Sequence, residues 1–280
     1  MTTKKVTAII PCRKGSQRIA NKNTRPFGAY QHGLLALKLQ QLAVAETIDE
    51  ILVTSNDPVV ISYVLSVQKS LGKPVLLDRR PDRYATDDSL HSLVGYLSRL
   101  IQTDTVAWTH VTSPLFTAAL YDEAMNAYKK AVNNQEADSL MTVDAVQTFA
   151  IRSGQWISHD PQAKRWPRTQ DLEEIFLLNN ALFVIDLALM QECQDRVGHL
   201  PMLFETPAPY GFDIDWEDDF VLGEKLLMAL SNGESGQQCL PDKANADIYN
   251  ACANAFSESI DLAKVIRGSM CSTLAFSAEH

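Results

Sequence analysis

The sequence predicts an α/β fold, in which a mainly parallel, twisted sheet carries helices on both faces. Over the first 145 residues, short apolar runs alternate with longer amphipathic stretches. Strands that alternate with helices of this size form βαβ units, whose crossover helices cover both faces of a parallel sheet. The length of 280 residues is close to the upper limit for one hydrophobic core. We therefore expect one large domain rather than several small ones.

The first half opens with a continuous apolar run, Val6–Pro11, which predicts a buried strand. Leu, Ala and Val then recur at helical spacing in Leu34–Val44. Turn residues end the next strand and the next helix. Ser-Asn-Asp-Pro at positions 55–58 follows the strand, and a glycine at position 72 follows the helix. These elements and the ones after them are strand Ile51–Thr54, helix Val59–Leu71, strand Pro74–Leu77, helix Ser89–Ile101, strand Thr105–Thr109, helix Leu120–Val132 and strand Ser139–Val143.

The second half is less regular. Residues 144–178 are polar and show no helical period. The strand pattern returns at Ala181–Ile185, and an amphipathic helix is expected over Glu217–Leu230. Beyond it, Ser, Asn, Gly and Gln precede an Ala-rich tail that holds three of the five cysteines. We assign residues 1–230 to the α/β domain and residues 231–280 to a C-terminal extension of unknown role.

Composition excludes several function classes. The chain has 25 Lys and Arg against 34 Asp and Glu, a net charge of −9, which disfavours general binding to nucleic acid or anionic membranes. No apolar stretch approaches the 18 residues that a membrane-spanning helix needs. The odd number of cysteines and the lack of a Cys-x-x-Cys pair fit reduced thiols. We expect a soluble, cytoplasmic protein.

The loop after the first strand combines four cations with a Gly-Ser pair. Glycine lets backbone N–H groups approach a ligand closely, and arginine offers forked donors that suit phosphate oxygens. In parallel sheets, ligands bind at the carboxyl ends of the strands, where this loop lies. The loop therefore predicts a phosphate site, and a solvated basic loop is the alternative. Neither G-x-x-x-x-G-K-[ST] nor G-x-G-x-x-G occurs, which disfavours P-loop kinases and NAD dehydrogenases. The loop residues concerned are Arg13, Lys14, Gly15, Ser16, Arg18, Lys22 and Asn23.

Two carboxylates two residues apart, Asp213 and Asp215, form the second feature. On a strand, such residues point to the same side. Paired carboxylates suit Mg²⁺ that is also bound by substrate phosphates. In the alternative interpretation, Asp215 only caps the following helix. The cationic loop in the same chain favours the metal interpretation, because phosphoryl and nucleotidyl transfer uses both cations and a metal.

Further polar residues flank two predicted strands. Thr112 and Ser113 follow the fourth strand, where their hydroxyls could contact a base or ribose, and Asn179 and Asn180 precede the strand at Ala181–Ile185. Turn formation is the alternative at both places. His110 has no partner at metal-ligand spacing, so a structural role is its alternative.

Together and in this order, these segments resemble the acylneuraminate cytidylyltransferase family, which includes the CMP-sialic acid synthetases. Residues 9–23, IIPCRKGSQRIANKN, resemble the family signature I-[IL]-[PA]-A-R-x-G-S-K-x-[IL]-x-x-K-N. The resemblance spans residues 4 to about 230. Its other matches are TSND at 54–57, RRPDRYATDD at 79–88, TSPL at 112–115, LNNALFVI at 178–185 and FDIDWEDDF at 212–220.

The resemblance implies a Rossmann-like nucleotidyltransferase fold and a reaction. The anomeric oxygen of an acidic sugar would attack the α-phosphate of CTP and release pyrophosphate. Sialic, legionaminic and pseudaminic acids are the acceptors implied. The irregular segment 144–178 matches the part of the family that forms a homodimer, and Arg165 or Arg168 would then reach the partner's sugar pocket.

The resemblance also implies roles for individual residues. Arg13 and Lys22 would contact the CTP triphosphate, and Asp213 and Asp215 would carry Mg²⁺; these four residues would support catalysis. The rest of the nucleotide site would comprise Gly15, Ser16, Arg18, Asn23, Arg80, Thr112 and Ser113, and the acceptor site would comprise His110, Arg168, Asn179 and Asn180.

The sequence departs from the family mainly on the acceptor side. His110 and Phe116 stand where members commonly have Gln and Arg, Asn180 replaces a glycine, and Gln17 replaces the lysine that follows Gly-Ser in the signature. The acceptor therefore stays open, and an eight-carbon sugar acid similar to Kdo or a phosphonate is an alternative. A nucleotide-binding relative that no longer turns over is a third possibility.

Overall fold

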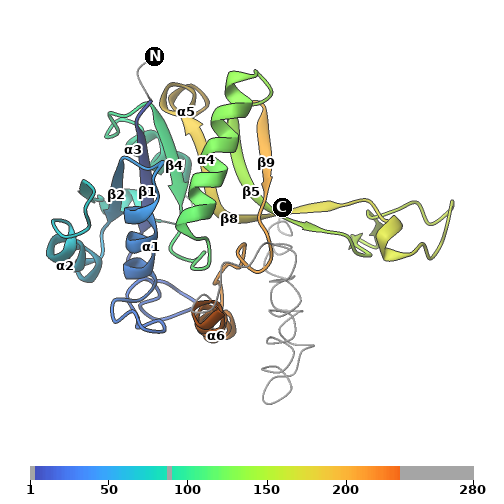
Figure 1. Cartoon of the computed structure of the whole chain (residues 1–280), viewed down its shortest axis with the longest axis horizontal. Helices are drawn as coiled ribbons and strands as arrows, with labels where there is room; N and C mark the ends of the chain where they lie inside the picture. The colour runs from blue at the N-terminus through green and yellow to red at the C-terminus, as the bar shows by residue number, and fades with distance from the viewer. Residues whose placement is uncertain (1–3, 87–89, 234–280) are drawn as a thin grey trace.

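The computed structural model describes residues 4–86 and 90–233. Its main feature is one seven-stranded sheet with the strand order β3-β2-β1-β4-β8-β5-β9 (Figure 1). The α/β class predicted from the sequence is confirmed. The strands of this sheet are β1 (Val6–Cys12), β2 (Glu50–Ser55), β3 (Val75–Arg79), β4 (Thr105–Thr109), β5 (Ser139–Val146), β8 (Ile175–Asp186) and β9 (Pro201–Glu205).

The helices alternate with these strands along the first half of the chain, as the periodicity predicts. Two helices end earlier than the sequence predicts: α2 ends at Val67 instead of Leu71, and α3 ends at Leu97 instead of Ile101. The α-helices are α1 (Gly33–Val44), α2 (Pro58–Val67), α3 (Leu90–Leu97), α4 (Ala118–Asn133), α5 (Leu187–Cys193) and α6 (Glu217–Gly233); 3₁₀ turns are η1 (Asp82–Tyr84) and η3 (Thr169–Asp171).

The sheet is mainly parallel, with one reversed strand. Strand β1 pairs in parallel with β2 on one side and with β4 on the other. Strand β8 is antiparallel to both of its neighbours, β4 and β5. The carboxyl ends of β1 and β4 therefore lie side by side at one edge of the sheet, next to the start of the β8 segment that runs beside β4. This edge holds the candidate site.

Side chains of β1 alternate between two hydrophobic cores, as expected for a strand buried on both faces. Val6, Ala8 and Ile10 pack into the larger core, which α1, α2 and α4 cover. Ile9 packs into the smaller core, which α3 and α5 cover. Cys12 ends the strand almost fully buried, and burial raises the pKa of its thiol to about 12.

The irregular segment 144–178 is shorter than the sequence indicates. Strand β5 continues to Val146 and β8 already begins at Ile175, so both ends of the segment belong to the sheet. Residues 147–174 between them form an arm that extends away from the sheet (Figure 1). The arm contains a short hairpin of β6 (Ile151–Arg152) and β7 (Gln155–Trp156).

Aromatic side chains hold the arm together. Phe149, Trp156 and Trp166 meet edge to face, with ring centroids 5.5 to 5.9 Å apart. Trp166 nevertheless remains 62% exposed.

Residues 234–280, with Cys239, Cys252 and Cys271, lie outside the described residues. Within residues 4–86 and 90–233, no helix is both long and apolar enough to cross a membrane.

Candidate active site

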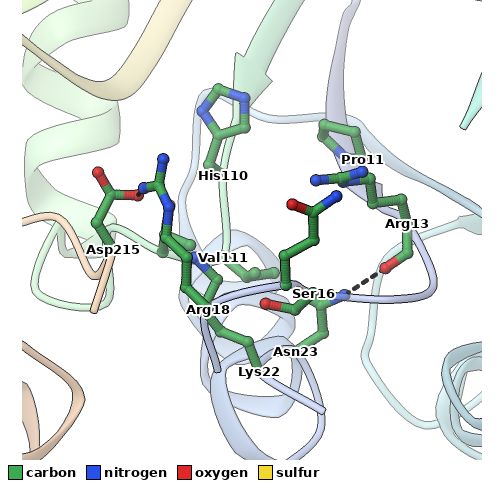
Figure 2. Close-up of a pocket in the computed structure, with 11 residues that line it drawn as sticks. Pro11, Arg13, Ser16, Arg18, Lys22, Asn23, His110, Val111 and Asp215 are labelled. Atoms are coloured by element: carbon green, nitrogen blue, oxygen red, sulfur yellow. Dashed lines mark hydrogen bonds and ion pairs between the residues drawn. The ribbon is translucent and has the colours of Figure 1, made fainter. Parts of the chain in front are cut away.

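A pocket of about 540 Å³ lies at the carboxyl ends of β1 and β4 (Figure 2). It is the place where the sequence predicts a phosphate site. Most of its wall comes from the loop after β1, and the rest comes from the turn after β4 and from one carboxylate near α6. The lining residues are Pro11, Arg13, Ser16, Gln17, Arg18, Lys22, Asn23, His110, Val111, Thr112 and Asp215.

The loop after β1 is shaped by backbone contacts that its sequence allows. Gly15 has φ +79°, in the left-handed region that favours glycine. The backbone N–H of Lys14 donates to Asn56 Oδ1 at 2.8 Å. The Asn23 side-chain amide donates to the carbonyl oxygen of Arg13 at 3.2 Å, which ties the two ends of the loop together (Figure 2). The loop is therefore held in a curved conformation with Arg13, Arg18 and Lys22 around one pocket.

Lys22 links this loop to the segment before α6. Its ammonium group donates to the carbonyl oxygen of Ile214 at 2.9 Å, across 192 residues of sequence. Burial lowers the pKa of Lys22, while the carboxylates of Asp213 and Asp215 act in the opposite direction. The predicted convergence of the cationic loop with the two aspartates is present in the structure.

The local geometry of the two aspartates differs from the sequence prediction. Residues 212–215 form no strand, so the same-side argument from strand geometry is wrong. The backbone N–H of Ile214 instead donates to the carbonyl oxygen of Thr112 at 2.8 Å. A contact with the turn after β4 therefore takes the place of sheet pairing and holds the segment against the pocket.

The two carboxylates have different surroundings. Asp215 forms an ion pair with Arg18 at 2.9 Å (Figure 2), and the Arg18 guanidinium also lies over the ring of Trp216. Just before α6, Asp219 Oδ2 accepts the backbone N–H groups of Asp215 and Trp216. Burial raises the pKa of Asp213 to about 6, and a hydrogen bond with Thr112 opposes this shift.

These residues fit a magnesium ion that also binds substrate phosphates. Asp213 Oδ1 is buried and has no hydrogen-bond partner within residues 4–86 and 90–233. An acceptor oxygen without a partner, next to a second carboxylate, is a suitable ligand for a hard cation. No group of three His, Cys, Asp or Glu side chains forms a metal site in the described part of the chain. Mg²⁺ usually keeps several waters and phosphate oxygens, so two carboxylates suffice.

His110 lines the pocket, yet both of its ring nitrogens are engaged inside the protein. Nδ1 lies 2.9 Å from the carbonyl oxygen of Asn180, so it carries the proton of a neutral ring. Nε2 then accepts from Trp108 Nε1 at 3.2 Å and faces the Arg196 guanidinium at 3.3 Å. Burial and the nearby charge of Arg196 lower the pKa of His110 to about 4. His110 is therefore neutral at pH 7 and presents carbon atoms to the pocket.

Several residues that the sequence singles out do not line the pocket. The buried Arg80 guanidinium donates to the carbonyl oxygen of Thr54 at 2.7 Å. Asn179 is buried and donates to Asp144 and Thr206 at 2.9 and 3.0 Å. The remaining residues of this kind are Lys14 and Gly15 in the loop after β1, Ser113 and Asp213 next in sequence to Thr112 and Ile214, Asn180 behind His110, and Arg165 and Arg168 in the arm, where Arg168 pairs with Asp171 at 2.8 Å.

Sequence reasoning missed two cations near the site. Lys38 lies fully buried in α1 and donates to the carbonyl oxygen of Ser113. Arg196 lies after α5 and contacts His110. A lysine among five apolar neighbours at Leu34–Leu39 is a signal that could have found the first, because charged residues are rarely placed on a core face. For Arg196 the sequence holds no comparable signal.

Comparison with solved structures identifies proteins with the same fold. The CMP:2-keto-3-deoxy-manno-octonic acid synthetase complexed with CTP is 12% identical, with a TM-score of 0.55 over 81% of this chain and 99% of that one. The 4-diphosphocytidyl-2C-methyl-D-erythritol synthase of Anaerococcus prevotii DSM 20548 is 11% identical, with a TM-score of 0.58 over 80% and 96%. A cytidylyltransferase of Leptospira borgpetersenii serovar Hardjo-bovis (strain JB197) is 13% identical, with a TM-score of 0.54 over 92% and 100%.

At this level of identity, the comparisons establish a shared fold. No family model matches the sequence, and no curated protein matches it. The coarser part of the resemblance, the nucleotidyltransferase fold with its mainly parallel sheet, is confirmed. Membership of the acylneuraminate family stays a prediction.

Proposed function

We propose that the protein is a CTP-dependent cytidylyltransferase that joins CMP to an acidic sugar and releases pyrophosphate. The observation that carries the proposal is the pocket in which Arg13, Arg18 and Lys22 meet Asp215, with Asp213 beside it. A cluster of cations next to a carboxylate pair suits a triphosphate with its metal. The fold neighbours named above are cytidylyltransferases, and one of them is a complex with CTP.

The reaction needs little covalent chemistry from the protein. An oxygen of the acceptor forms a bond to the α-phosphorus of CTP, and the bond from that phosphorus to the bridging oxygen of pyrophosphate breaks. The negative charge that develops on the phosphates is stabilised by cations held in place beforehand. Arg13 and Lys22 supply such cations from the loop after β1. Backbone N–H groups near Ser16 add neutral donors to the same phosphates.

Magnesium would be held by Asp213 and Asp215. When bound, the metal supplies additional positive charge to the phosphates and can increase the acidity of a hydroxyl. Asp215 lines the pocket and contacts Arg18 at 2.9 Å. His110 takes no part in proton transfer, since both ring nitrogens are engaged and its pKa lies near 4.

The acceptor is proposed to be a nonulosonic acid such as sialic, legionaminic or pseudaminic acid, as the sequence resemblance implies. A Kdo-like eight-carbon acid is the second candidate. It is favoured by the likeness to the synthetase of CMP:2-keto-3-deoxy-manno-octonic acid. Both acceptors are keto acids that carry one carboxylate, so the same nucleotide site would serve either.

A homodimer is proposed through the arm, residues 147–174. Trp166 is 62% exposed at the surface of the arm, and an exposed tryptophan is typical of a protein interface. Arg165 and Arg168 in the same arm would then face the partner's acceptor pocket.

The direct test is pyrophosphate release from CTP and Mg²⁺ with a panel of acceptors. The panel contains N-acetylneuraminic, legionaminic and pseudaminic acids, Kdo and a small phosphonate, and UTP, ATP and GTP replace CTP as controls. Release that depends on one acidic sugar and on CTP would support the proposal. Tight CTP binding without release from any acceptor would instead indicate a binding protein, and failure to bind CTP would overturn the proposal.

A further inference from the structure

Arg196 occupies an unusual position for a charged residue. It follows α5, and its guanidinium lies over the ring of Phe183, 3.8 Å from the centroid, and 5.8 Å from that of Trp108. Its NH1 group lies 3.3 Å from Nε2 of His110. Phe183 and Trp108 are paired on neighbouring strands β8 and β4. The charge of Arg196 is therefore placed against the core of the sheet and directly behind a residue of the pocket wall.

This charge has no counter-ion in the part of the chain that the structure describes. No carboxylate of residues 4–86 and 90–233 forms an ion pair with Arg196. Burial lowers the pKa of Arg196 from 12.5 to about 10, and the charge of Asp195 compensates only in part. Arg196 is half-buried, and even partial removal of a cation from water without a partner destabilises a protein, so such residues are rare without a function.

The neighbours of Arg196 offer it aromatic faces and one neutral acceptor. His110 cannot balance the charge, because its ring is neutral. A guanidinium carries five N–H donors, and His110 is the single hydrogen-bond partner of the Arg196 guanidinium among the described residues; the backbone N–H of Arg196 donates to Asp195 Oδ1. Donors remain available for a ligand with oxygen acceptors. A carboxylate suits them best, because it accepts two parallel hydrogen bonds from a guanidinium.

The position relative to the pocket indicates which ligand this is. Figure 2 shows His110 at the margin of the pocket away from Lys22 and Asn23. The phosphate-binding cations lie in the loop after β1, whereas Arg196 lies beyond His110 on the side of β8. A triphosphate bound in that loop does not need Arg196. An anion next to His110 would belong to the other substrate.

We propose that Arg196 binds the carboxylate of the acceptor and so selects an acidic over a neutral sugar. This inference rests on the proposed function and adds to it a residue that fixes the substrate class. It also accounts for the departures on the acceptor side. His110 and Phe116 replace a polar pair of the family pattern, and Arg196 supplies the positive charge from a different element.

The test compares Arg196→Met with the unchanged protein and with a control variant, Arg99→Met. Arg99 is an exposed arginine just after α3. Methionine keeps the apolar contact with Phe183 and removes the charge. Calorimetry measures binding of N-acetylneuraminate and Kdo to the CTP-loaded protein, each beside its methyl ester. We expect the affinity for the acid to fall about 10- to 100-fold in Arg196→Met, as for the loss of a hydrogen-bonded charge. CTP affinity and ester affinity should change less than about twofold.

Binding does not require turnover, so this test and the test of the proposed function fail in different ways. Equal affinity of the unchanged protein and Arg196→Met for the acid would overturn the inference, and so would failure of the unchanged protein to bind either acid. If the acid binds and its binding depends on Arg196, but no pyrophosphate is released, the carboxylate site is supported and the proposed reaction is overturned.

A urea titration separates binding from a structural role. Removal of an unbalanced charge should leave the midpoint of unfolding unchanged or higher. A midpoint that falls in Arg196→Met together with CTP affinity would show a structural residue and overturn the inference.

Discussion

The ammonium group of Lys38 donates a hydrogen bond to the carbonyl oxygen of Ser113 at 2.8 Å, in the interior of the protein. Its second partner is the hydroxyl of Tyr121, also at 2.8 Å. Burial lowers the pKa of Lys38 to about 7. Helix α1 therefore holds the turn after β4 in place through Ser113. Thr112, the residue before Ser113, lines the pocket.

Replacement of this lysine should destabilise the protein. Lys38→Ala removes both hydrogen bonds and leaves a cavity, so we expect the free energy of unfolding to fall by about 2–4 kcal/mol. Urea denaturation measures the change. Lys129→Ala, on the exposed face of α4, is the matched control and should stay within about 0.5 kcal/mol. Equal stability of Lys38→Ala and the unchanged protein would show that the support is dispensable.

The nucleotide site is tested by Arg13→Ala. If Arg13 contacts the triphosphate, its loss should weaken CTP binding about 10- to 100-fold and cytidine binding less than about twofold. Calorimetry with both ligands provides the comparison. Lys14→Ala is the control, because Lys14 is an exposed cation in the same loop that does not line the pocket. Equal losses for CTP and cytidine would contradict a contact with the phosphates.

The metal assignment is tested by Asp215→Asn. Asparagine keeps the shape of the side chain and removes the charge, so turnover should fall by roughly 100-fold or more while CTP still binds. The dependence of CTP binding on Mg²⁺ should weaken in the same variant, and this readout needs no turnover. Asp218→Asn, an exposed carboxylate in the first turn of α6, should behave as the unchanged protein. Full activity of Asp215→Asn would remove the assignment.

His110 should make stability depend on pH in mild acid. Its pKa is about 4 in the folded protein and about 6.5 when unfolded. Between these values the unfolded state binds the proton and the folded state does not, so His110 costs stability as the pH falls from about 6.5 to about 4. The positive charges of Arg196, Lys38 and Lys22 all disfavour protonation.

The measurement is the free energy of unfolding of His110→Gln and of the unchanged protein at several pH values. The difference between them should shift in favour of the variant as the pH falls through this window. A difference that is constant from pH 7 to pH 4 would contradict the folded-state pKa.

The oligomeric state is tested by light scattering. We expect about twice the 31.1 kDa mass of the chain, and Trp166→Glu in the arm should return it to the monomer. Val44→Glu, a change at another exposed apolar residue, on α1, is the control and should leave the dimer intact. A strict monomer of the unchanged protein would end the dimer proposal.

Sequence periodicity was sufficient for the parallel half of the fold. The elements from Val6 to Val143 are found in the predicted order, because fully buried strands and their covering helices have distinct apolar patterns. Strand direction is not encoded in this way. The run Ala181–Ile185 has the same apolar character in either direction, so the reversal of β8 could not be predicted. Strand β9 and helix α5 are short and only partly buried, and they were missed.

The candidate site was predicted in composition but not in geometry. Arg13, Lys22 and Asp215 do meet, since loops at the carboxyl ends of β1 and β4 converge on one edge of the sheet. The strand assumed for residues 212–215 is absent, because the backbone of Ile214 bonds to the turn after β4. Arg196 approaches from a distant loop through packing on Phe183, and no local pattern announces such a contact.

The bond from Lys22 to Ile214 has a consequence for the nascent chain. The loop after β1 leaves the ribosome 192 residues ahead of its partner, a delay of roughly 10–40 s at ordinary rates of translation. During that interval the loop exists without the wall that Ile214 and its two neighbouring aspartates provide. Under the proposed function, nucleotide capture would therefore require nearly the whole domain, and CTP would stabilise only chains that have finished folding.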